Sequence, residues 1–201
     1  MYIFGNSYFE TLILKNTFQF VFLFFVITEI LIWCFTGISS RKQVGKKERG
    51  DKGSYFLIVA GNTATIFIDV LSRKKLAFNL PVLFFWIGII LTITGVLLRV
   101  FSVWTLRHFF TLSVQVSSVQ NIVQNGPYKY LRHPAYTGNI LTFTGFAMAF
   151  RSLPGILGTL IILAFIYAYR IKVEENMLEN KLGVSYRKYK KTTWKIIPFM
   201  W

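Results

Sequence analysis

The sequence is poor in cysteine and histidine, the side chains that most often bind metals. Its one cysteine, Cys34, lies within a hydrophobic run, so neither an intramolecular disulfide nor a cluster of thiolate ligands is available within the chain. The two histidines, His108 and His133, are not part of a His-Glu-x-x-His motif, and we expect no metal site. A P-loop and a Gly-x-Gly-x-x-Gly turn after a strand are also missing. A nucleotide-like cofactor would therefore not be held by a soluble nucleotide-binding fold.

Charged residues are scarce as well. They make up 15% of the chain, against about 25% in typical soluble domains, whereas hydrophobic residues make up 54% and aromatic residues 18%. This composition predicts an integral membrane protein. Five hydrophobic runs approach the roughly 20 residues that cross a bilayer: residues 17–38, 55–71, 80–105, 136–150 and 154–171. The first run starts too late and is too long for a signal peptide, so we expect it to be retained.

The predicted fold class is all-α integral membrane, with about five transmembrane helices and a C-terminal interfacial amphipathic helix. The second and fourth runs are short, which indicates a tilted pair or hairpin whose ends are covered by protein. We expect a single membrane domain over residues 1–201. Residues 1–105 would hold three spans and a basic loop (39–54), and residues 106–201 the cofactor-binding and catalytic half. Within that half, residues 106–123 suggest a short extended or hairpin segment.

Basic residues outnumber acidic ones by 23 to 8. With five spans, seventeen of them fall on one side of the membrane, in residues 41–52, 107–132 and 170–195, and five on the other. This placement in loops argues against nucleic acid as a partner. By the positive-inside rule the basic side is cytoplasmic, which puts the N-terminus outside and the C-terminus in the cytoplasm. The same loops are expected to bind anionic lipid headgroups.

Residues 125–138, with the sequence Asn-Gly-Pro-Tyr-Lys-Tyr-Leu-Arg-His-Pro-Ala-Tyr-Thr-Gly, form a polar and aromatic cluster in an otherwise apolar chain. Pro134 suits the first turn of a helix, where its missing N–H costs nothing. The free backbone N–H groups and positive dipole of that helix start would favour a carboxylate. An amino-acid-like end of a cofactor would fit there.

A second polar block covers residues 170–191, where apolar residues alternate with charges as in an interfacial amphipathic helix. Arg170 and Glu174 are four residues apart and share a helix face, and Glu175 lies on the neighbouring face. Tyr186 and Tyr189 are interpreted as interfacial anchors. Both blocks are expected on the cytoplasmic side, as a shared site requires.

Together these motifs resemble the isoprenylcysteine carboxyl methyltransferase family over about the C-terminal half of the chain. The resemblance is carried by Trp104-Thr105-Leu106, Phe109-Phe110-Thr111, Asn125-Gly126-Pro127-Tyr128, Arg132-His133-Pro134-Ala135-Tyr136-Thr137-Gly138, and Arg170 with Glu174-Glu175, Leu178, Leu182-Gly183, Tyr186 and Tyr189. It implies a membrane enzyme that moves a methyl group from S-adenosylmethionine to a lipophilic acceptor taken from the bilayer. The chain departs from the family at Gln120, where a histidine is common, and an amide cannot carry a proton at neutral pH.

The resemblance also implies site residues. The cofactor would lie between the Arg-His-Pro loop and the C-terminal helix, against Val123, Gly126, Tyr128, Arg132, His133, Pro134, Tyr136, Gly138, Glu174 and Glu175. Arg170 and Glu174 would serve the acceptor as catalytic residues. Arg132 and Arg170 could instead extend to lipid headgroups.

Several acceptors and reactions stay open. A carboxylate, such as that of an isoprenylcysteine, is already a nucleophile at pH 7 and needs only Arg170 to orient it. A phospholipid amine would need a base, for which Glu174 or Glu175 could serve. A third alternative is an NADPH-dependent, sterol-reductase-like enzyme, although such reductases carry Asp-Glu where this chain has Glu174-Glu175. A non-catalytic scaffold would have little use for two matched polar blocks.

Glu29 and Arg99 are charged residues inside predicted spans, and an intramembrane carboxylate is costly unless it is paired or functional. Arg99 is the most plausible partner of Glu29. Two hypotheses follow: a structural ion pair or protonated Glu29, or a polar lining of the acceptor tunnel.

Overall fold

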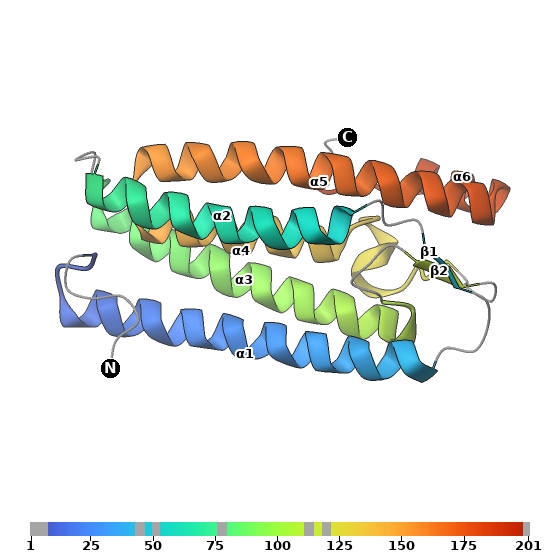
Figure 1. Ribbon diagram of the computed structural model, residues 1–201, viewed down its shortest axis with the longest axis horizontal. Helices are drawn as coiled ribbons and strands as arrows, with labels where there is room; N and C mark the ends of the chain where they lie inside the picture. The colour runs from blue at the N-terminus through green and yellow to red at the C-terminus, as the bar shows by residue number, and fades with distance from the viewer. Residues whose placement is uncertain are drawn as a thin grey trace.

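The computed structural model describes residues 8–42, 47–49, 53–75, 80–110, 115–117 and 122–198. Within these ranges the elements are α1 (Leu12–Lys42), β1 (Lys47–Arg49), α2 (Ser54–Lys75), α3 (Val82–Leu106), η1 (Arg107–Phe109), β2 (Gln115–Ser117), η2 (Gly126–Lys129), α4 (Pro134–Ala149), α5 (Leu153–Leu182) and α6 (Val184–Thr192). Helices α1 to α5 run side by side, and α6, β1 and β2 lie together at one end (Figure 1). The all-α membrane fold class is confirmed.

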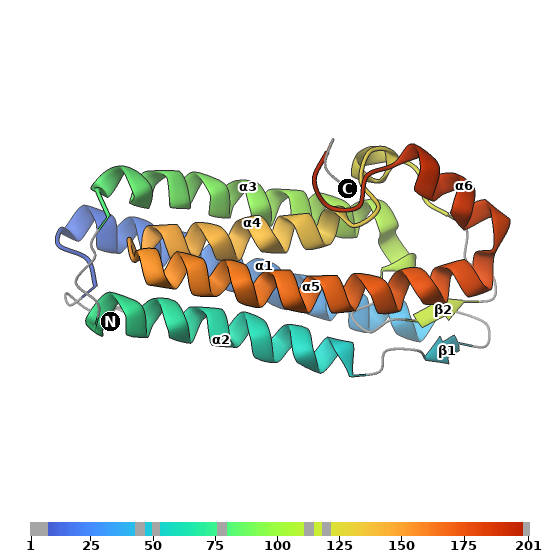
Figure 2. The ribbon, with the colours of Figure 1, turned by 90° about the horizontal axis from the view of Figure 1, so that it is seen from above.

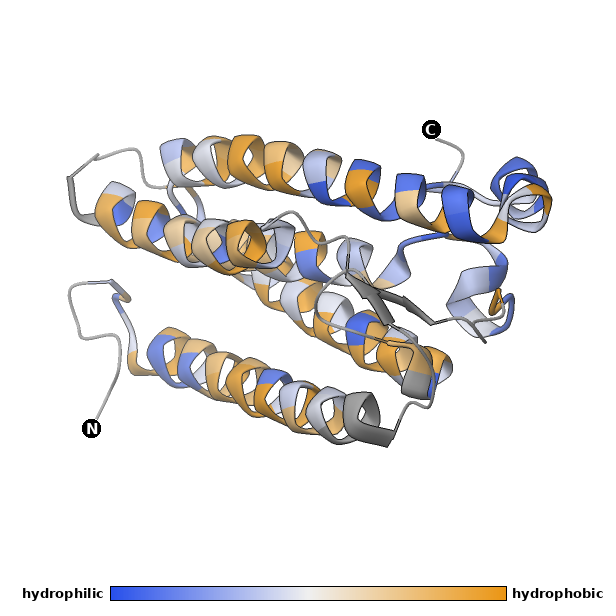
Figure 3. Cartoon of the chain, turned by 45° about the vertical axis from the view of Figure 1, so that its right-hand side comes forward, coloured by the Kyte–Doolittle hydropathy of each residue, from blue (hydrophilic) through white to orange (hydrophobic). Residues whose placement is uncertain are grey.

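Among the residues that the structure describes, four helices are long and apolar enough to span a membrane: Leu12–Gly37, Ser54–Arg73, Val82–Leu106 and Leu153–Leu182. Hydrophobic residues make up much of the long helices (Figure 3), and many of them are on the outside of the bundle: Phe20, Phe56 and Phe165 are each more than 70% exposed. Because a water-facing surface would not tolerate such side chains, this surface faces lipid. The protein is an integral membrane protein.

The fourth predicted span, residues 136–150, forms α4, which differs from the other four helices. Its 16 residues extend about 24 Å at about 1.5 Å per residue, less than the roughly 30 Å of a bilayer core. It packs against α3, α5 and α2, and most of its residues are buried (Figure 2). Helix α4 is therefore a core helix enclosed by protein, as its short hydrophobic run indicated.

Glycines bring α3 and α4 into backbone contact. Gly88 and Gly95 of α3 face Gly145 and Gly138 of α4, and a Cβ atom added at any of the four would lie 2.4–2.7 Å from an atom of the opposite helix. The seven-residue spacing in each helix keeps both pairs on one face. Inside a bilayer the hydrophobic effect does not drive helices together. Small residues stabilise such a helix pair because they permit close van der Waals packing.

At the end of the bundle opposite α6, the segment before α1 folds back into the core. Phe9 is 4% exposed and packs on Phe18, Phe85 and Phe150, with ring centroids 4.8–5.9 Å apart. Beside it, Glu10 forms an ion pair with Arg151 at 3.1 Å. Aromatic packing therefore closes this end.

The predicted C-terminal amphipathic helix, residues 170–191, is split between the end of α5 and the separate helix α6. Helix α5 continues without a break from the membrane to Leu182, so Arg170, Glu174 and Glu175 belong to the spanning helix itself. It ends at Gly183, whose φ of 55° lies in the left-handed region that favours glycine. Only α6 then forms a separate amphipathic helix.

The predicted extended segment within residues 106–123 is present in part. Residues 115–117 form β2, which pairs antiparallel with β1 from the basic loop, with Glu48 opposite Val116. The sequence gives no expectation of this partner. The strand pair joins the loop after α1 to the segment that leads into η2.

Gly95→Ala tests the α3–α4 contact. The new Cβ would lie 2.5 Å from the Gly138 carbonyl oxygen, so the helices must separate, and we expect a loss of about 1–3 kcal/mol in the free energy of unfolding. The measurement is thermal unfolding in detergent. Gly37→Ala in α1 is the control, because no atom lies within 4 Å of its Cβ position, and it should leave stability unchanged or slightly raised. Equal effects of the two substitutions would contradict the contact.

Candidate functional site

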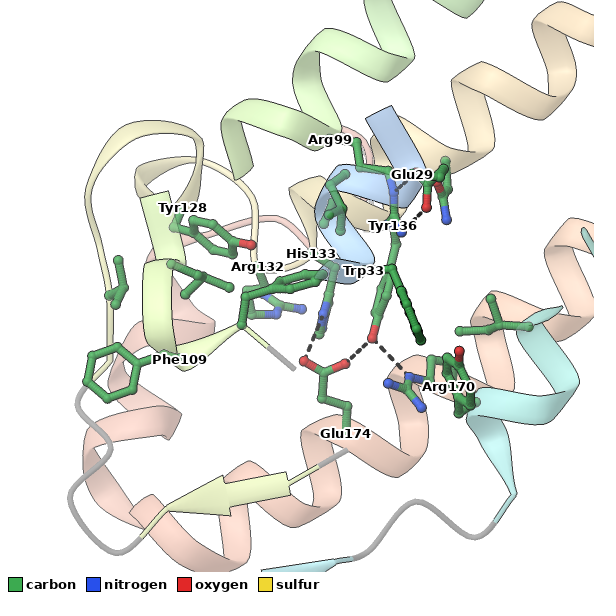
Figure 4. Close-up of a pocket in the computed structure, with 18 of the residues that line it drawn as sticks. Glu29, Trp33, Arg99, Phe109, Tyr128, Arg132, His133, Tyr136, Arg170 and Glu174 are labelled. Atoms are coloured by element: carbon green, nitrogen blue, oxygen red, sulfur yellow. Dashed lines mark hydrogen bonds and ion pairs between the residues drawn. The ribbon is translucent and has the colours of Figure 1, made fainter. Parts of the chain in front are cut away.

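A cavity of about 480 Å³ lies at the end of the bundle where α4 begins and α5 approaches α6. Every long helix and α6 contribute to its wall. Most of the lining is apolar or aromatic, including Phe25, Ile58 and Phe143, and charged side chains enter it at two levels (Figure 4). Such a cavity, apolar with a few convergent polar groups, is typical of a site for a lipophilic ligand.

Arg170, Tyr136 and Glu174 form a hydrogen-bonded chain in this cavity. The Arg170 Nε donates to the Tyr136 hydroxyl at 3.0 Å, and that hydroxyl donates to Glu174 Oε2. Arg170 Nη1 also donates to Ser54 Oγ at 2.6 Å, at the start of α2. Arg170 is 2% exposed. Three helices thus fix a buried guanidinium beside a carboxylate.

His133 lies on the other side of the same carboxylate. Its ring stacks on Tyr136 with centroids 5.4 Å apart and an interplanar angle of 11°. Its Nδ1 lies 3.9 Å from Glu174 Oε1, and its Nε2 lies 3.3 Å from Glu175 Oε1. The imidazole therefore lies between two consecutive carboxylates of α5.

The Arg-His-Pro loop is fixed by the C-terminal segment, residues 193–197. The backbone N–H groups of Arg132 and His133 donate to the carbonyl oxygens of Trp194 and Lys195, at 2.8 and 3.1 Å. The Arg132 guanidinium pairs with Glu175 at 2.8 Å and donates to the Lys190 carbonyl at 3.1 Å. These bonds hold the two residues that precede Pro134, the first residue of α4, against the C-terminal segment.

Helix α6 turns its tyrosines inward, which corrects the interpretation of Tyr186 and Tyr189 as interfacial anchors. Both line the cavity and are buried, whereas Arg187, Lys188 and Lys191 of the same helix are exposed. The Tyr189 hydroxyl donates to the Tyr128 carbonyl at 2.7 Å. Burial raises the pKa of Tyr189, so its hydroxyl stays protonated and continues to donate. The three-residue spacing fits either role, and only packing decides between them.

The predicted site residues separate into two groups. The cavity wall includes Val123, Tyr128, Arg132, His133, Tyr136, Arg170 and Glu174. The other four lie next to this wall: Gly126 forms a turn with φ of 56°, Pro134 begins α4, Gly138 contacts α3, and Glu175 pairs with Arg132 behind the loop. Gln120 and the His108 side chain lie outside what the structure describes.

Glu29 and Arg99 form the predicted pair, which is confirmed. Arg99 donates through Nε to Glu29 Oε1 at 2.5 Å and through Nη2 to Oε2 at 3.0 Å. Both residues also line the cavity. The ion pair is therefore present on the cavity wall, and a role of this pair in an acceptor tunnel stays a prediction.

Ser54, Asn62 and Asn139 also contribute to the site, and the sequence did not single them out. Asn62 and Asn139 line the cavity, and Ser54 is fully buried against Arg170. The available signal was a polar residue within or beside an apolar run. Among the residues that the structure describes, no three His, Cys, Asp or Glu side chains come together in a group that could hold a metal ion.

The fold and the site define a class: a helical integral membrane protein with a cavity reached by charged side chains at one end of the bundle. A family model for phospholipid methyltransferase matches residues 83–185, just over half of the chain. The chain belongs to this family. The match covers α3, α4 and α5, which supply most of the hydrogen-bonded groups described above.

Individual relatives agree with this assignment. The chain is 31% identical over 115 residues to protein-S-isoprenylcysteine O-methyltransferase of Dictyostelium discoideum, covering 56% of this chain and 48% of that protein. It is 25% identical over 115 residues to protein-S-isoprenylcysteine O-methyltransferase A of Arabidopsis thaliana, covering 56% and 58%. The chain thus spans about half the length of the curated relatives it matches.

A solved structure shares the fold. The eukaryotic intramembrane Ras methyltransferase, isoprenylcysteine carboxyl methyltransferase, superposes with a TM-score of 0.62 at 22% identity, over 91% of this chain and 67% of that one. The likeness extends beyond the family match into the N-terminal helices.

Glu29→Gln tests the intramembrane pair. The change leaves the Arg99 charge buried without a countercharge, and we expect the free energy of unfolding to fall by about 3 kcal/mol. The measurement is thermal unfolding in detergent. Replacing both residues with leucine should recover most of this loss, since an apolar pair of similar volume often substitutes for a buried ion pair. Normal activity in Glu29→Gln, at a temperature where it remains folded, would rule out a role in the tunnel.

Proposed function

We propose that this protein is a membrane methyltransferase that transfers a methyl group from S-adenosylmethionine to a lipophilic carboxylate, of the kind carried by an isoprenylcysteine. The observation that carries the proposal is the buried Arg170, linked through Tyr136 to Glu174, in a cavity of a phospholipid methyltransferase family member. The names of the relatives supply the acceptor class.

The residues at the α6 end of the cavity fit S-adenosylmethionine. Tyr186 has a buried hydroxyl without a hydrogen-bond partner among the described residues, and it lines the cavity. Tyr128 offers an aromatic face nearby, and Glu174 a carboxylate that can attract an ammonium or a sulfonium. We assign cofactor binding to this end, with Val123 and His133 on the same wall and Gly126, Arg132, Pro134, Gly138 and Glu175 shaping the loop.

The protein's own contribution to the reaction is to position the acceptor and the cofactor. The cofactor would supply a methyl group bound to a sulfonium sulfur. After transfer that sulfur would be a neutral thioether, so the leaving group needs no general acid. Arg170 orients the acceptor carboxylate, which is ionised at pH 7 and attacks directly. The apolar wall excludes water, which would otherwise solvate the nucleophile. Glu174, held by Tyr136 and His133, fixes the cofactor end and the acceptor end relative to each other.

A carboxylate is the better acceptor for this arrangement than an amine. Arg170 is a permanent cation at the cavity wall, and it would repel a protonated phospholipid amine. Glu174 Oε2 already accepts the hydrogen bond of Tyr136, so this oxygen is occupied and does not face an amine. The phospholipid amine and the NADPH-dependent reduction thus remain alternatives for experiment.

We further propose how the protein sits in the membrane. The predicted basic segments, including the loop with β1 and helix α6, lie at one end of the bundle (Figure 1). The positive-inside rule makes that end cytoplasmic, with the N-terminus outside. Exposed Arg187, Lys188 and Lys191 would then contact anionic headgroups beside the cavity. In this proposal residues 1–201 act as a single membrane domain.

Calorimetry of the detergent-solubilised protein distinguishes the two cofactor classes. We expect S-adenosylhomocysteine, the demethylated product, to bind and NADPH not to bind, because Glu174 and Glu175 offer no partner for the phosphates of NADPH. Binding of NADPH alone would overturn the proposed function.

Arg170→Ala separates the acceptor role from the cofactor role. Because the guanidinium orients the acceptor, we expect methyl transfer to fall by at least about 100-fold while the Kd for S-adenosylhomocysteine stays within a few-fold of its original value. Lys172→Ala is the matched control, since it removes a basic charge from an exposed position of the same helix and should leave both quantities unchanged. The role assignment fails if cofactor binding disappears with Arg170.

A further inference from the structure

A second polar layer lies deeper in the cavity than the chain formed by Arg170, Tyr136 and Glu174. Asn139 follows Tyr136 by three residues on α4, and Tyr167 precedes Arg170 by three residues on α5. Since α4 begins and α5 ends near the site, both lie about 4.5 Å farther into the bundle, at about 1.5 Å per residue. The Glu29–Arg99 pair is also on this side, beyond the Tyr136 ring from Glu174 (Figure 4).

Two amide side chains in this layer have unsatisfied hydrogen-bonding groups. Asn139 Nδ2 donates to the Tyr167 hydroxyl at 2.9 Å, and Asn62 of α2 also interacts with that hydroxyl. The Oδ1 atoms of both asparagines are buried and have no partner among the described residues. Exchanging the oxygen and nitrogen positions of either amide does not give both oxygens a hydrogen-bond donor. Tyr167 has one hydroxyl proton, so it can satisfy only one of the two amide oxygens.

These amides face the cavity and not the lipid. Both Asn62 and Asn139 belong to its wall, and Asn139 is only 4% exposed. Their neighbours on the wall, including Phe25, Ile58 and Phe143, are apolar and offer no hydrogen bond. A hydrocarbon chain lying here would leave both amide oxygens buried and unpaired, which is costly.

We infer that the natural acceptor carries a hydroxyl or a secondary amide at this depth, about one helical turn from its reacting carboxylate, and that Asn62 and Asn139 bind it. Either group can donate a hydrogen bond, which the unpaired amide oxygens of Asn62 and Asn139 require. The acceptor is then not hydrocarbon along the whole length that the cavity encloses. The inference rests on the proposed function, because that function places the carboxylate at Arg170.

The test compares the binding of lipophilic acids that differ in one group. The probes are hexadecanoic acid, its 5-hydroxy derivative, and its 15-hydroxy derivative as a positional control, each titrated into the full chain in detergent. The hydroxyl on the fifth carbon lies about one helical turn from the carboxylate. Since a hydrogen bond made to an otherwise unpaired buried group is decisive for affinity, we expect the 5-hydroxy acid to bind about tenfold more tightly than the other two.

Variants assign the preference to the two asparagines. The double substitution Asn62→Leu with Asn139→Leu should abolish the advantage of the 5-hydroxy acid and leave the affinity for hexadecanoic acid unchanged or higher. Asn62→Leu alone, at a half-buried position, keeps the test available if the double variant does not fold, and it should lose a large part of the advantage. Asn176→Leu, exposed on α5, is the control and should retain the full preference.

Two outcomes overturn the inference. Equal affinity of the original chain for the three acids would mean that water satisfies the amides, and a preference that survives the leucine substitutions would place its origin elsewhere. Incorporation of a labelled methyl group is measured in the same samples. This second measurement tests the proposed reaction separately from the proposed subsite. If the 5-hydroxy acid binds selectively but no bound acid is ever methylated, the subsite stands and the assigned reaction fails.

Discussion

The backbone contact between α3 and α4 is the constraint on which the site depends. A 16-residue helix cannot cross the membrane by itself, and it is retained in the bundle because Gly88 and Gly95 let it approach α3 closely. This contact fixes the start of α4 opposite the later turns of α5. His133 and Tyr136 are carried on that start, so they reach Glu174. A wider separation of α3 and α4 would move both side chains away from α5.

The polar groups of the cavity are connected to one another because they lie where water is largely excluded. Arg170 is held by Tyr136 and Ser54, His133 lies between Glu174 and Glu175, and Arg99 binds Glu29 through two nitrogens. In a low-dielectric interior an unpaired charge is expensive, so each charge has a fixed position. That rigidity suits a reaction in which orientation of the nucleophile contributes most of the catalysis. The exceptions among the described residues of the cavity wall are the Asn62 and Asn139 amide oxygens and the Tyr186 hydroxyl, which makes these unpaired groups informative.

The Arg-His-Pro loop and the C-terminal segment form one unit although sixty residues separate them in the sequence. Backbone hydrogen bonds join Arg132 and His133 to Trp194 and Lys195, and Tyr189 secures the carbonyl of Tyr128. The C-terminal segment thus positions the loop at the α6 end of the cavity. The charged side chains of α6 point outward, and Tyr186 and Tyr189 on its other face complete the cavity wall.

The sequence by itself determined the membrane class, the positions of four spans and the pairing of Glu29 with Arg99, because hydrophobic run length and the cost of an intramembrane charge are local properties. Motif order also indicated the family and brought Arg170, Glu174, His133 and Tyr136 into one hypothesis. Only the tertiary structure decided that α5 continues to Leu182, that Tyr186 and Tyr189 face inward, and that Ser54, Asn62 and Asn139 reach the cavity. These features depend on which face of each helix meets its neighbours. Helical spacing restricts that choice but does not fix it, since packing contacts such as those of Gly95 and Gly138 set the rotation of every helix about its own axis.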